Sequence, residues 1–180
     1  KGLNDVRSLI SRYYGGVYFS YKQAADIDVI LEGIDRFVPD ENRDLYLAAL
    51  LSTASDVVDT VGKHFAQPIK ARDSKGKIKV TVYNKAVKDK TIDVPVLYRE
   101  WLLKYKNLSK NDFQHTTLQG DYEQCLMMLP DNVKTVYADP PYTRDHYSRY
   151  YHVLETLTLR DTPKISKVTI HGSTHVSNGI

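Results

Sequence analysis

The 180-residue sequence has a single cysteine, Cys125, which excludes an internal disulfide and fits a reducing cytoplasm. It also lacks any apolar run near the ~20 residues that a membrane-spanning helix needs, so we expect no membrane partner. His171 and His175 have the i, i+4 spacing of a helical metal site, but Gly172 between them disfavours a helix and we predict no metal. With 42% hydrophobic and 26% charged residues, the composition is typical of one globular, soluble unit.

Three catalytic signatures are missing as well. The sequence contains no glycine-rich kinase loop, no nucleophile elbow of the hydrolases and no Cys-x-x-Cys pair. Phosphoryl transfer, serine hydrolysis and thiol redox chemistry therefore have no motif to support them.

Residues 1–62 predict a helical region. A first apolar stripe fits one face of a helix that Pro39 ends, and its members are Ile27, Ile30, Leu31, Ile34 and Phe37. A second helix is expected to begin with Asp40 as its N-cap and to close at Gly62. Its inward stripe is Leu47, Leu50, Leu51, Ala54, Val57, Val58 and Val61. Neither helix carries groups suited to chemistry, so we expect both to be scaffold.

Residues 63–110 form a basic region. Between residues 63 and 90 nine Lys and Arg face two Asp, a net charge of +7, although the whole chain carries only +3. Residues 78–82 alternate apolar and polar side chains, which predicts a half-buried strand with residues 91–94 as its hairpin partner. Such a basic hairpin suits contact with nucleic-acid phosphates or recognition of a target, and a solvated lysine-rich face is the alternative. The lysines concerned are Lys75, Lys77 and Lys79.

Residues 111–180 predict an α/β portion. Residues 115–119 and 133–138 read as strands with a helix between them. In an open parallel sheet the ligand crevice lies outside the carboxyl ends of the strands. Asp121 and Asp139 each follow a predicted strand, so we expect both carboxylates along one rim of the sheet.

The second predicted strand runs into Asp139-Pro140-Pro141-Tyr142. Two consecutive prolines fix φ and remove two amide donors, so the strand must stop there. This tetrapeptide, and the stretch DPPYTRDHYSRYYHVLE that it opens, resemble the N6-adenine (amino) DNA methyltransferases of the restriction-modification and Dam-like type. An Asp-Pro-Pro turn at a strand end, which ordinary loops use, is the alternative interpretation.

The resemblance implies a Rossmann-like sheet and transfer of a methyl group from S-adenosylmethionine to the N6 amine of adenine in double-stranded DNA. That amine is a weak nucleophile, so it must be held by hydrogen-bond acceptors while it attacks the methyl group in line. Asp139 would supply a carboxylate acceptor and the Pro140 carbonyl, forced outward by Pro141, a second one. Tyr142 would offer a face on which an extruded base stacks.

The resemblance also assigns residues to the cofactor and to DNA. Asp121 would accept a hydrogen bond from the adenine of S-adenosylmethionine. The residues expected near DNA phosphate or the target base are Arg144, His146, Tyr147 and Arg149. A cognate restriction endonuclease is the protein partner that this family implies.

One motif of the resembled family is absent. No Phe-x-Gly-x-Gly stretch, the glycine turn that binds the methionine half of the cofactor, occurs in the sequence. The sequence therefore predicts a fragment or a permuted motif order, and a 180-residue chain that does not bind the cofactor measurably alone. Missing strands would leave apolar edges, which a second copy in a homodimer could cover.

Two alternatives to adenine methylation in DNA remain open at the level of sequence. The same motif class methylates RNA adenine or cytosine, although Asp at the first position argues for adenine. A non-catalytic nucleic-acid-binding remnant of the fold is the third hypothesis.

Overall fold

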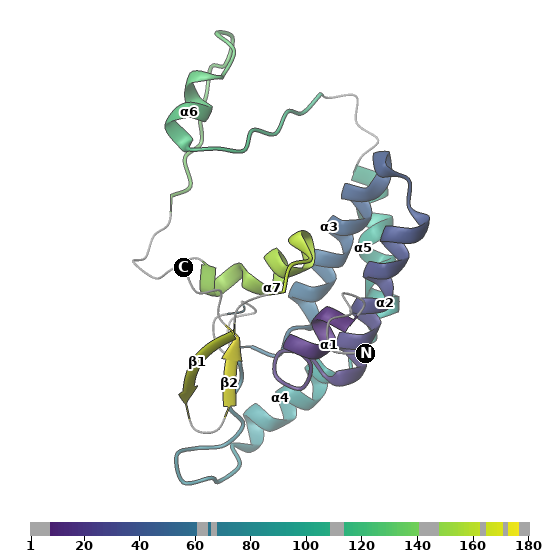
Figure 1. Cartoon of the computed structure of the whole chain (residues 1–180), viewed down its shortest axis with the longest axis vertical. Helices are drawn as coiled ribbons and strands as arrows, with labels where there is room; N and C mark the ends of the chain where they lie inside the picture. The colour runs from purple at the N-terminus through teal and green to yellow at the C-terminus, as the bar shows by residue number, and fades with distance from the viewer. Residues whose placement is uncertain are drawn as a thin grey trace.

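The computed structural model describes residues 8–60, 65, 68–108, 114–140, 148–162, 165–170 and 173–176, with Ser148 and the last two ranges described by their backbone alone. Figure 1 shows a helical body from which one long segment projects. The elements are α1 (Leu9–Tyr13), α2 (Tyr21–Phe37), α3 (Asp40–Val57), α4 (Val80–Lys90), α5 (Val94–Leu108), α6 (Tyr122–Met127), α7 (Ser148–Leu159), β1 (Ile165–Ile170) and β2 (Ser173–Val176).

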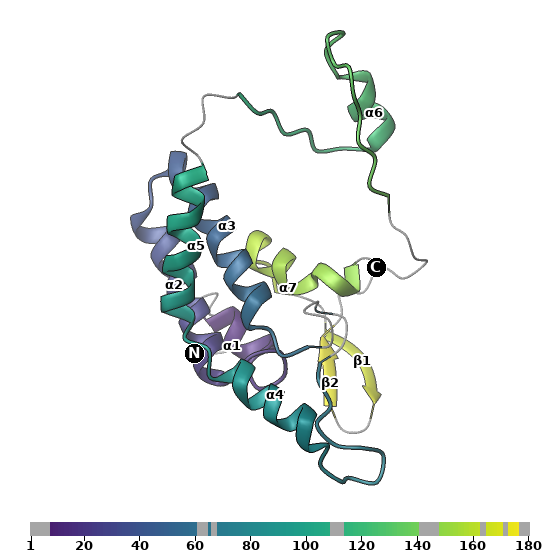
Figure 2. The same ribbon diagram turned by 180° about the vertical axis from the view of Figure 1, so that it is seen from behind.

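Helices α2, α3 and α5 pack side by side and make the body of the molecule (Figure 1, Figure 2). The two predicted scaffold helices are confirmed as α2 and α3. Three details differ from the prediction. Phe37 is the last residue of α2 and is 81% exposed, and the N-cap of α3 is Pro39, which leaves Asp40 as its first residue. Helix α3 ends at Val57, and Gly62 lies outside the described residues.

A buried carboxylate joins α1 to α2. Asp28 is 5% exposed, and its two oxygens accept hydrogen bonds from the amides of Ile10 and Ser11, both at 2.8 Å. These amides belong to the first turn of α1, where a helix has no acceptors of its own. Burial raises the pKa of Asp28, while the hydrogen bonds from Ser11 and Ile10 act in the opposite direction.

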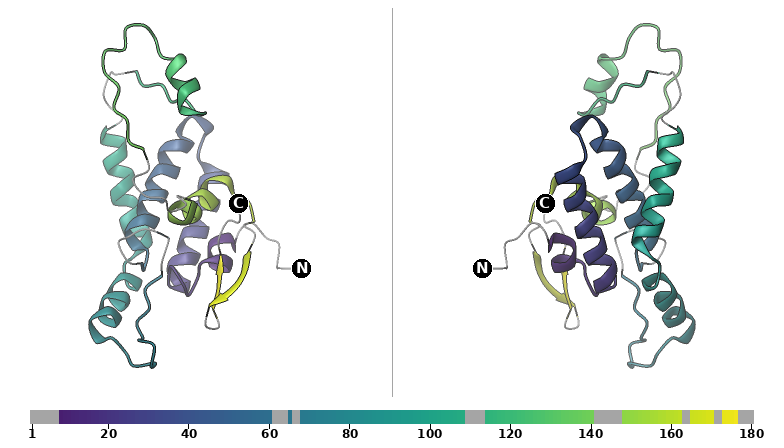
Figure 3. Two further views of the ribbon diagram at one scale, coloured as in Figure 1. Left: turned by 90° about the vertical axis from the view of Figure 1, so that its left-hand side faces the viewer. Right: turned by 90° about the vertical axis from the view of Figure 1, so that its right-hand side faces the viewer.

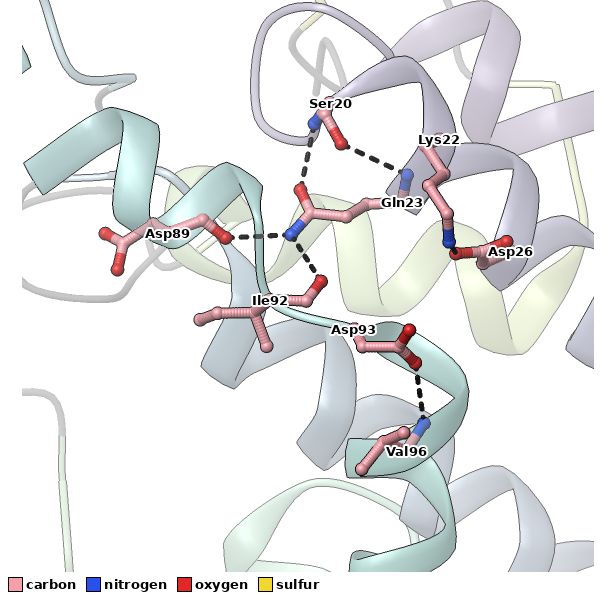
Figure 4. Close-up of polar contacts among 8 residues, drawn as sticks. All are labelled: Ser20, Lys22, Gln23, Asp26, Asp89, Ile92, Asp93 and Val96. Carbon is pink, nitrogen blue, oxygen red and sulfur yellow. Dashed lines mark hydrogen bonds and ion pairs between the residues drawn. The ribbon is translucent and has the colours of Figure 1, made fainter.

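A buried glutamine fixes the junction between α4 and α5. Ser20 and Gln23 form a capping box at the start of α2, and the Gln23 amide nitrogen donates to the carbonyls of Asp89 at 2.8 Å and Ile92 at 3.2 Å (Figure 4). Asp93 then accepts from the Val96 amide in the first turn of α5. The end of α4 is thus held against the start of α2.

The predicted strand at residues 78–82 and its hairpin partner at 91–94 are wrong. Residues 80–90 form α4, and Thr91 is its C-cap. The alternation was misleading because the segment also carries helix-stabilising features, including the i, i+4 pair of Lys85 with Asp89 at 2.9 Å and the carbonyl bonds from Gln23. Contacts with the rest of the fold therefore favour the helix over the strand that the local alternation predicts.

Helix α7 packs on the body through a cluster of four rings and one threonine that we call the α7 seat. Its members are Tyr14, Tyr18, Phe65, His152 and Thr156. The ring of His152 lies 5.7 Å from that of Tyr14, 5.5 Å from that of Tyr18 and 6.4 Å from that of Phe65, measured between centroids. The Tyr14 hydroxyl and Thr156 Oγ1 are 2.8 Å apart. Because Thr156 donates its own proton to the His152 carbonyl, Tyr14 is the donor to Thr156.

The predicted Rossmann-like sheet is contradicted by the structure. Within the described ranges the only sheet is the antiparallel pair β1 and β2, and residues 114–119 and 133–140 belong to no helix or strand. A strand is stable only when its amides and carbonyls find a neighbouring strand. The strands predicted at residues 115–119 and 133–138 are therefore wrong as well, and no partner strand lies beside these residues in the part of the chain that the structure describes.

Replacing Asp28 by Ala should destabilise this chain by about 2–3 kcal/mol, because two amides of α1 lose their acceptor inside the core. Asp28→Asn keeps one acceptor oxygen and should lose less. Urea unfolding of the three proteins measures the difference. Equal stability of the Ala variant and the parent would contradict the assigned role.

His152 should make stability depend on pH. Burial lowers the pKa of His152 below its usual 6.5, although its bond to the Arg149 carbonyl partly opposes this. The unfolded chain therefore takes up a proton near pH 6.5 that the folded chain refuses until lower pH. Stability should fall below about pH 6.5 by up to about 1.4 kcal/mol per pH unit.

The comparison variants are His152→Phe, which keeps a ring in the aromatic cluster, and His115→Phe, which changes an exposed histidine. Unfolding followed between pH 5 and 8, a range spanning the ordinary histidine pKa of about 6.5, should show a flatter profile for His152→Phe alone. Asp28 titrates in the opposite sense but is present in every protein, so its effect cancels in the comparison.

Candidate functional site

The first two residues of the motif lie at the end of an arm, residues 114–140, which stands away from the helical body (Figure 1, Figure 3). Asp139 and Pro140 are exposed and form the last described positions of this arm. Residues 133–140 belong to no helix or strand, so the strand predicted to run into the prolines is not formed. Pro141 and Tyr142 lie outside the described residues, so their roles remain predictions.

Asp121 is placed at the start of the short helix α6. Its side chain accepts a hydrogen bond from the Glu123 amide at 2.9 Å, and its carbonyl accepts one from Cys125 at 2.9 Å. Asp121 is therefore the N-cap of α6, the role that a Gly-Asp turn often plays. Its predicted bond to a cofactor stays untested by this geometry.

The structure does not form the expected rim that would carry Asp121 and Asp139 together, because the parallel sheet that would align them is not present in the described part of the chain. Binding of S-adenosylmethionine needs backbone amides at a glycine-rich turn between a strand and a helix. The described residues include no turn of this kind, and Asp121 already caps α6. Alone, these residues do not fit the cofactor.

The arm exposes many apolar side chains. Met127 and Tyr137 are 84% and 85% exposed. Others on the same arm are Leu118, Tyr122, Leu126, Met128, Val133 and Val136. An apolar surface of this extent is typical of a segment that other protein covers.

The basic turn between residues 72 and 79 is ordered by its one acidic residue. Asp73 Oδ1 accepts from the amides of Lys75 and Lys77, both at 2.9 Å, and the Asp73 amide donates to the Lys77 carbonyl. Gly76, at φ 81°, supplies the left-handed conformation that closes the turn. Lys75, Lys77 and Lys79 are all exposed on this turn, as a phosphate-binding surface requires.

The predicted DNA-contacting residues are not brought to one place by the described structure. The basic turn lies beyond α4, at the end of the body away from α6 (Figure 1, Figure 2). Arg149 is exposed in the first turn of α7. The predictions for Arg144, His146 and Tyr147 fall outside the described residues.

The α7 seat is the feature that sequence reasoning missed. His152 is 3% exposed and Thr156 is fully buried, on a helix that begins soon after the motif. The signal was a histidine and a threonine at i, i+4, next to Val153 and Leu157 on the same apolar stripe.

Several buried polar atoms near the seat have no hydrogen-bond partner in the described structure. They include His152 Nε2, Asp59 Oδ1 and Thr60 Oγ1. The Asp59 amide donates to the Tyr18 carbonyl at 2.9 Å, and its other carboxylate oxygen lies 3.2 Å from Lys90 Nζ. Buried groups left unsatisfied are rare and concentrate where a protein binds or reacts.

The described residues contain no group of three or more His, Cys, Asp or Glu able to hold a metal ion. No helix among them is long and apolar enough to cross a membrane.

Comparison with known proteins identifies the family. Residues 72–179, which include the Asp-Pro-Pro-Tyr motif, match the model of the D12 class N6 adenine-specific DNA methyltransferases. The chain is also 26% identical over 155 residues to the type II methyltransferase M.FokI of Planomicrobium okeanokoites, a match that covers 83% of this chain but 20% of that protein. No solved structure matches it. The family model spans more than half of the sequence, and the chain belongs to the D12 class of N6 adenine-specific DNA methyltransferases.

Proposed function

We propose that the protein methylates the N6 amine of adenine in DNA, with S-adenosylmethionine as the methyl donor. The observation that carries this proposal is the family match over residues 72–179, which contains Asp139 and the three residues after it. The exposed position of Asp139 at the end of an extended segment supports it, because a target base must reach this carboxylate. The cofactor supplies the methyl group, and the chemistry assigned to this chain concerns the amine.

In this proposal the Asp139 carboxylate and the Pro140 carbonyl accept hydrogen bonds from the two N–H groups of the adenine amine. Two acceptors draw the amine lone pair out of conjugation with the ring and fix its direction of attack. Tyr142 stacks on the extruded base and replaces part of the stacking lost from the duplex. No covalent intermediate between enzyme and base is involved.

DNA binding is assigned to the basic turn and to the segment that follows the motif. Lys75, Lys77 and Lys79 contact phosphates. Asp73 already holds the backbone of their turn in place, so binding costs less backbone entropy than it would on a flexible loop. Arg144, His146, Tyr147 and Arg149 contact phosphate or the target base. Asp121 contacts the cofactor adenine once other parts of the site are present.

The biological setting proposed is restriction-modification in the cytoplasm. The matched relative is named a type II methyltransferase. The resemblance to restriction-modification methyltransferases supports a cognate restriction endonuclease as the partner. The apolar residues exposed on the arm indicate that other protein packs against it, either another part of the methyltransferase or a second copy of the chain.

Asp139→Ala should abolish methyl transfer in the intact protein and leave DNA affinity within a few-fold, because the carboxylate acts on the amine rather than on phosphates. Incorporation of labelled methyl groups into DNA, with a parallel binding titration, measures both. Asp131→Ala, an exposed acid on the same arm, is the matched control and should keep full activity. An Asp139→Ala protein with more than about a tenth of parental activity, a loss of only about 1.4 kcal/mol, would remove Asp139 from the mechanism.

Replacing Lys75, Lys77 and Lys79 by Gln should weaken DNA binding and flatten its dependence on the logarithm of salt concentration by about 0.9 per lost phosphate contact. The matched control replaces Lys22, Lys104 and Lys106, which changes the net charge equally at other places on the surface. Affinity measured over a series of salt concentrations separates the two. Identical slopes for both variants would contradict the phosphate contacts, and the basic turn would then be an ordinary solvated surface.

A further inference from the structure

Helix α7 is the first described element after the motif. Nine steps along the chain lead from Asp139 to Ser148, and an extended chain advances by at most about 3.6 Å per residue. Asp139 therefore lies within about 32 Å of the start of α7. Any contact that fixes α7 limits where the motif can stand.

The α7 seat fixes this helix by a directed contact inside an apolar surrounding. The Tyr14 hydroxyl donates to Thr156, and Thr156 donates to the His152 carbonyl at 2.8 Å. Tyr14 and Thr156 are both 0% exposed, so water cannot replace either partner. A slide or rotation of α7 by one position would leave the Tyr14 hydroxyl buried without a partner, because Thr156 keeps its bond to the His152 carbonyl within the same helix.

The other end of α7 is fixed separately. Arg160 follows the helix with a φ of 57°, and its amide donates to the Thr156 carbonyl at 2.9 Å. Its guanidinium pairs with Asp35 of α2, which also pairs with Arg43 of α3. Two anchors, one near the middle and one at the end, define both the axial position and the rotation of the helix.

Apolar packing alone would not fix the axial position and rotation of α7. Val153 and Leu157 are fully buried in the same interface and would tolerate small shifts, since contacts between apolar side chains have little direction. The polar pair adds the direction. Burial raises the pKa of Tyr14, so its hydroxyl keeps the proton that it donates at any physiological pH.

We propose that Tyr14, His152 and Thr156 are positioning residues for methyl transfer: the buried contact of Tyr14, the C-cap of α1, with α7 holds the helix in one register and so sets where the Asp139 segment meets the target amine. None of the three touches the reacting atoms. The role rests on the proposed methyltransferase function, which supplies the reaction that the position serves.

The chain offers a matched pair of variants. Tyr14→Phe removes the hydroxyl bond between α1 and α7, whereas Tyr105→Phe removes a similar bond at 2.7 Å between Tyr105 of α5 and Ser52 of α3. Both changes delete one oxygen from an interhelical tyrosine. In the intact protein Tyr14→Phe should lower kcat about fivefold or more and leave DNA affinity within twofold, while Tyr105→Phe should leave both near parental values.

The partner residue gives a second, independent series. Thr156→Val should lower kcat as Tyr14→Phe does, Thr156→Ser should restore most of it because the hydroxyl returns, and the double variant should lose no more than either single one. Hydrogen exchange should rise in α7 for Tyr14→Phe and Thr156→Val, and in α5 for Tyr105→Phe. This exchange pattern checks the contact without any methylation assay.

The outcomes separate the two proposals. A parent protein that transfers no methyl group to DNA overturns the proposed function. An active parent in which Tyr14→Phe and Thr156→Val loosen α7 but keep parental kcat overturns the positioning role alone. A kcat loss that Thr156→Ser fails to restore, or that Tyr105→Phe shares, also overturns it, because the loss then follows stability rather than register.

Discussion

The hydrogen bond between Tyr14 and Thr156 joins residues 142 positions apart, and the placement of the last helix depends on it. Its strength comes from the dry surrounding of Tyr18, Phe65 and the His152 ring, where a hydroxyl has no alternative partner. Burial in the same surrounding lowers the pKa of His152. One contact thus combines directional bonding with apolar burial, and α7 cannot be moved without disturbing both.

The periodicity of the sequence predicts the features of the fold that depend on neighbouring residues alone. The apolar stripes of α2 and α3 and the end of α2 before Pro39 follow from a repeat of 3.6 residues and from a residue that cannot continue a helix. Residues 78–82 misled because the alternation covers only five positions, and three of these belong to a helix that continues to Lys90. The bonds that hold the end of this helix come from Gln23 to the carbonyls of Asp89 and Ile92, 66 and 69 residues later, and no local pattern reveals them.

The family could be predicted and the geometry of the site could not. Four residues with a definite chemical reason, Asp139 to Tyr142, identified the methyltransferase family, because few other chemistries need an acceptor followed by two prolines and a ring. The expected rim of Asp121 and Asp139 depended on a sheet, which is a property of many strands at once. Exposed valines and tyrosines on the arm are what a strand sequence shows when its neighbours are not beside it.

The separation between Tyr14 and Thr156 also matters for the order in which the protein forms on the ribosome. At about 5–20 residues per second, roughly 7–28 seconds pass between the synthesis of α1 and that of α7. During that interval Tyr14, Tyr18 and Phe65 have no histidine to pack against. The nascent chain therefore carries an uncovered aromatic surface, one that chaperones recognise, until almost the whole of this sequence has been made.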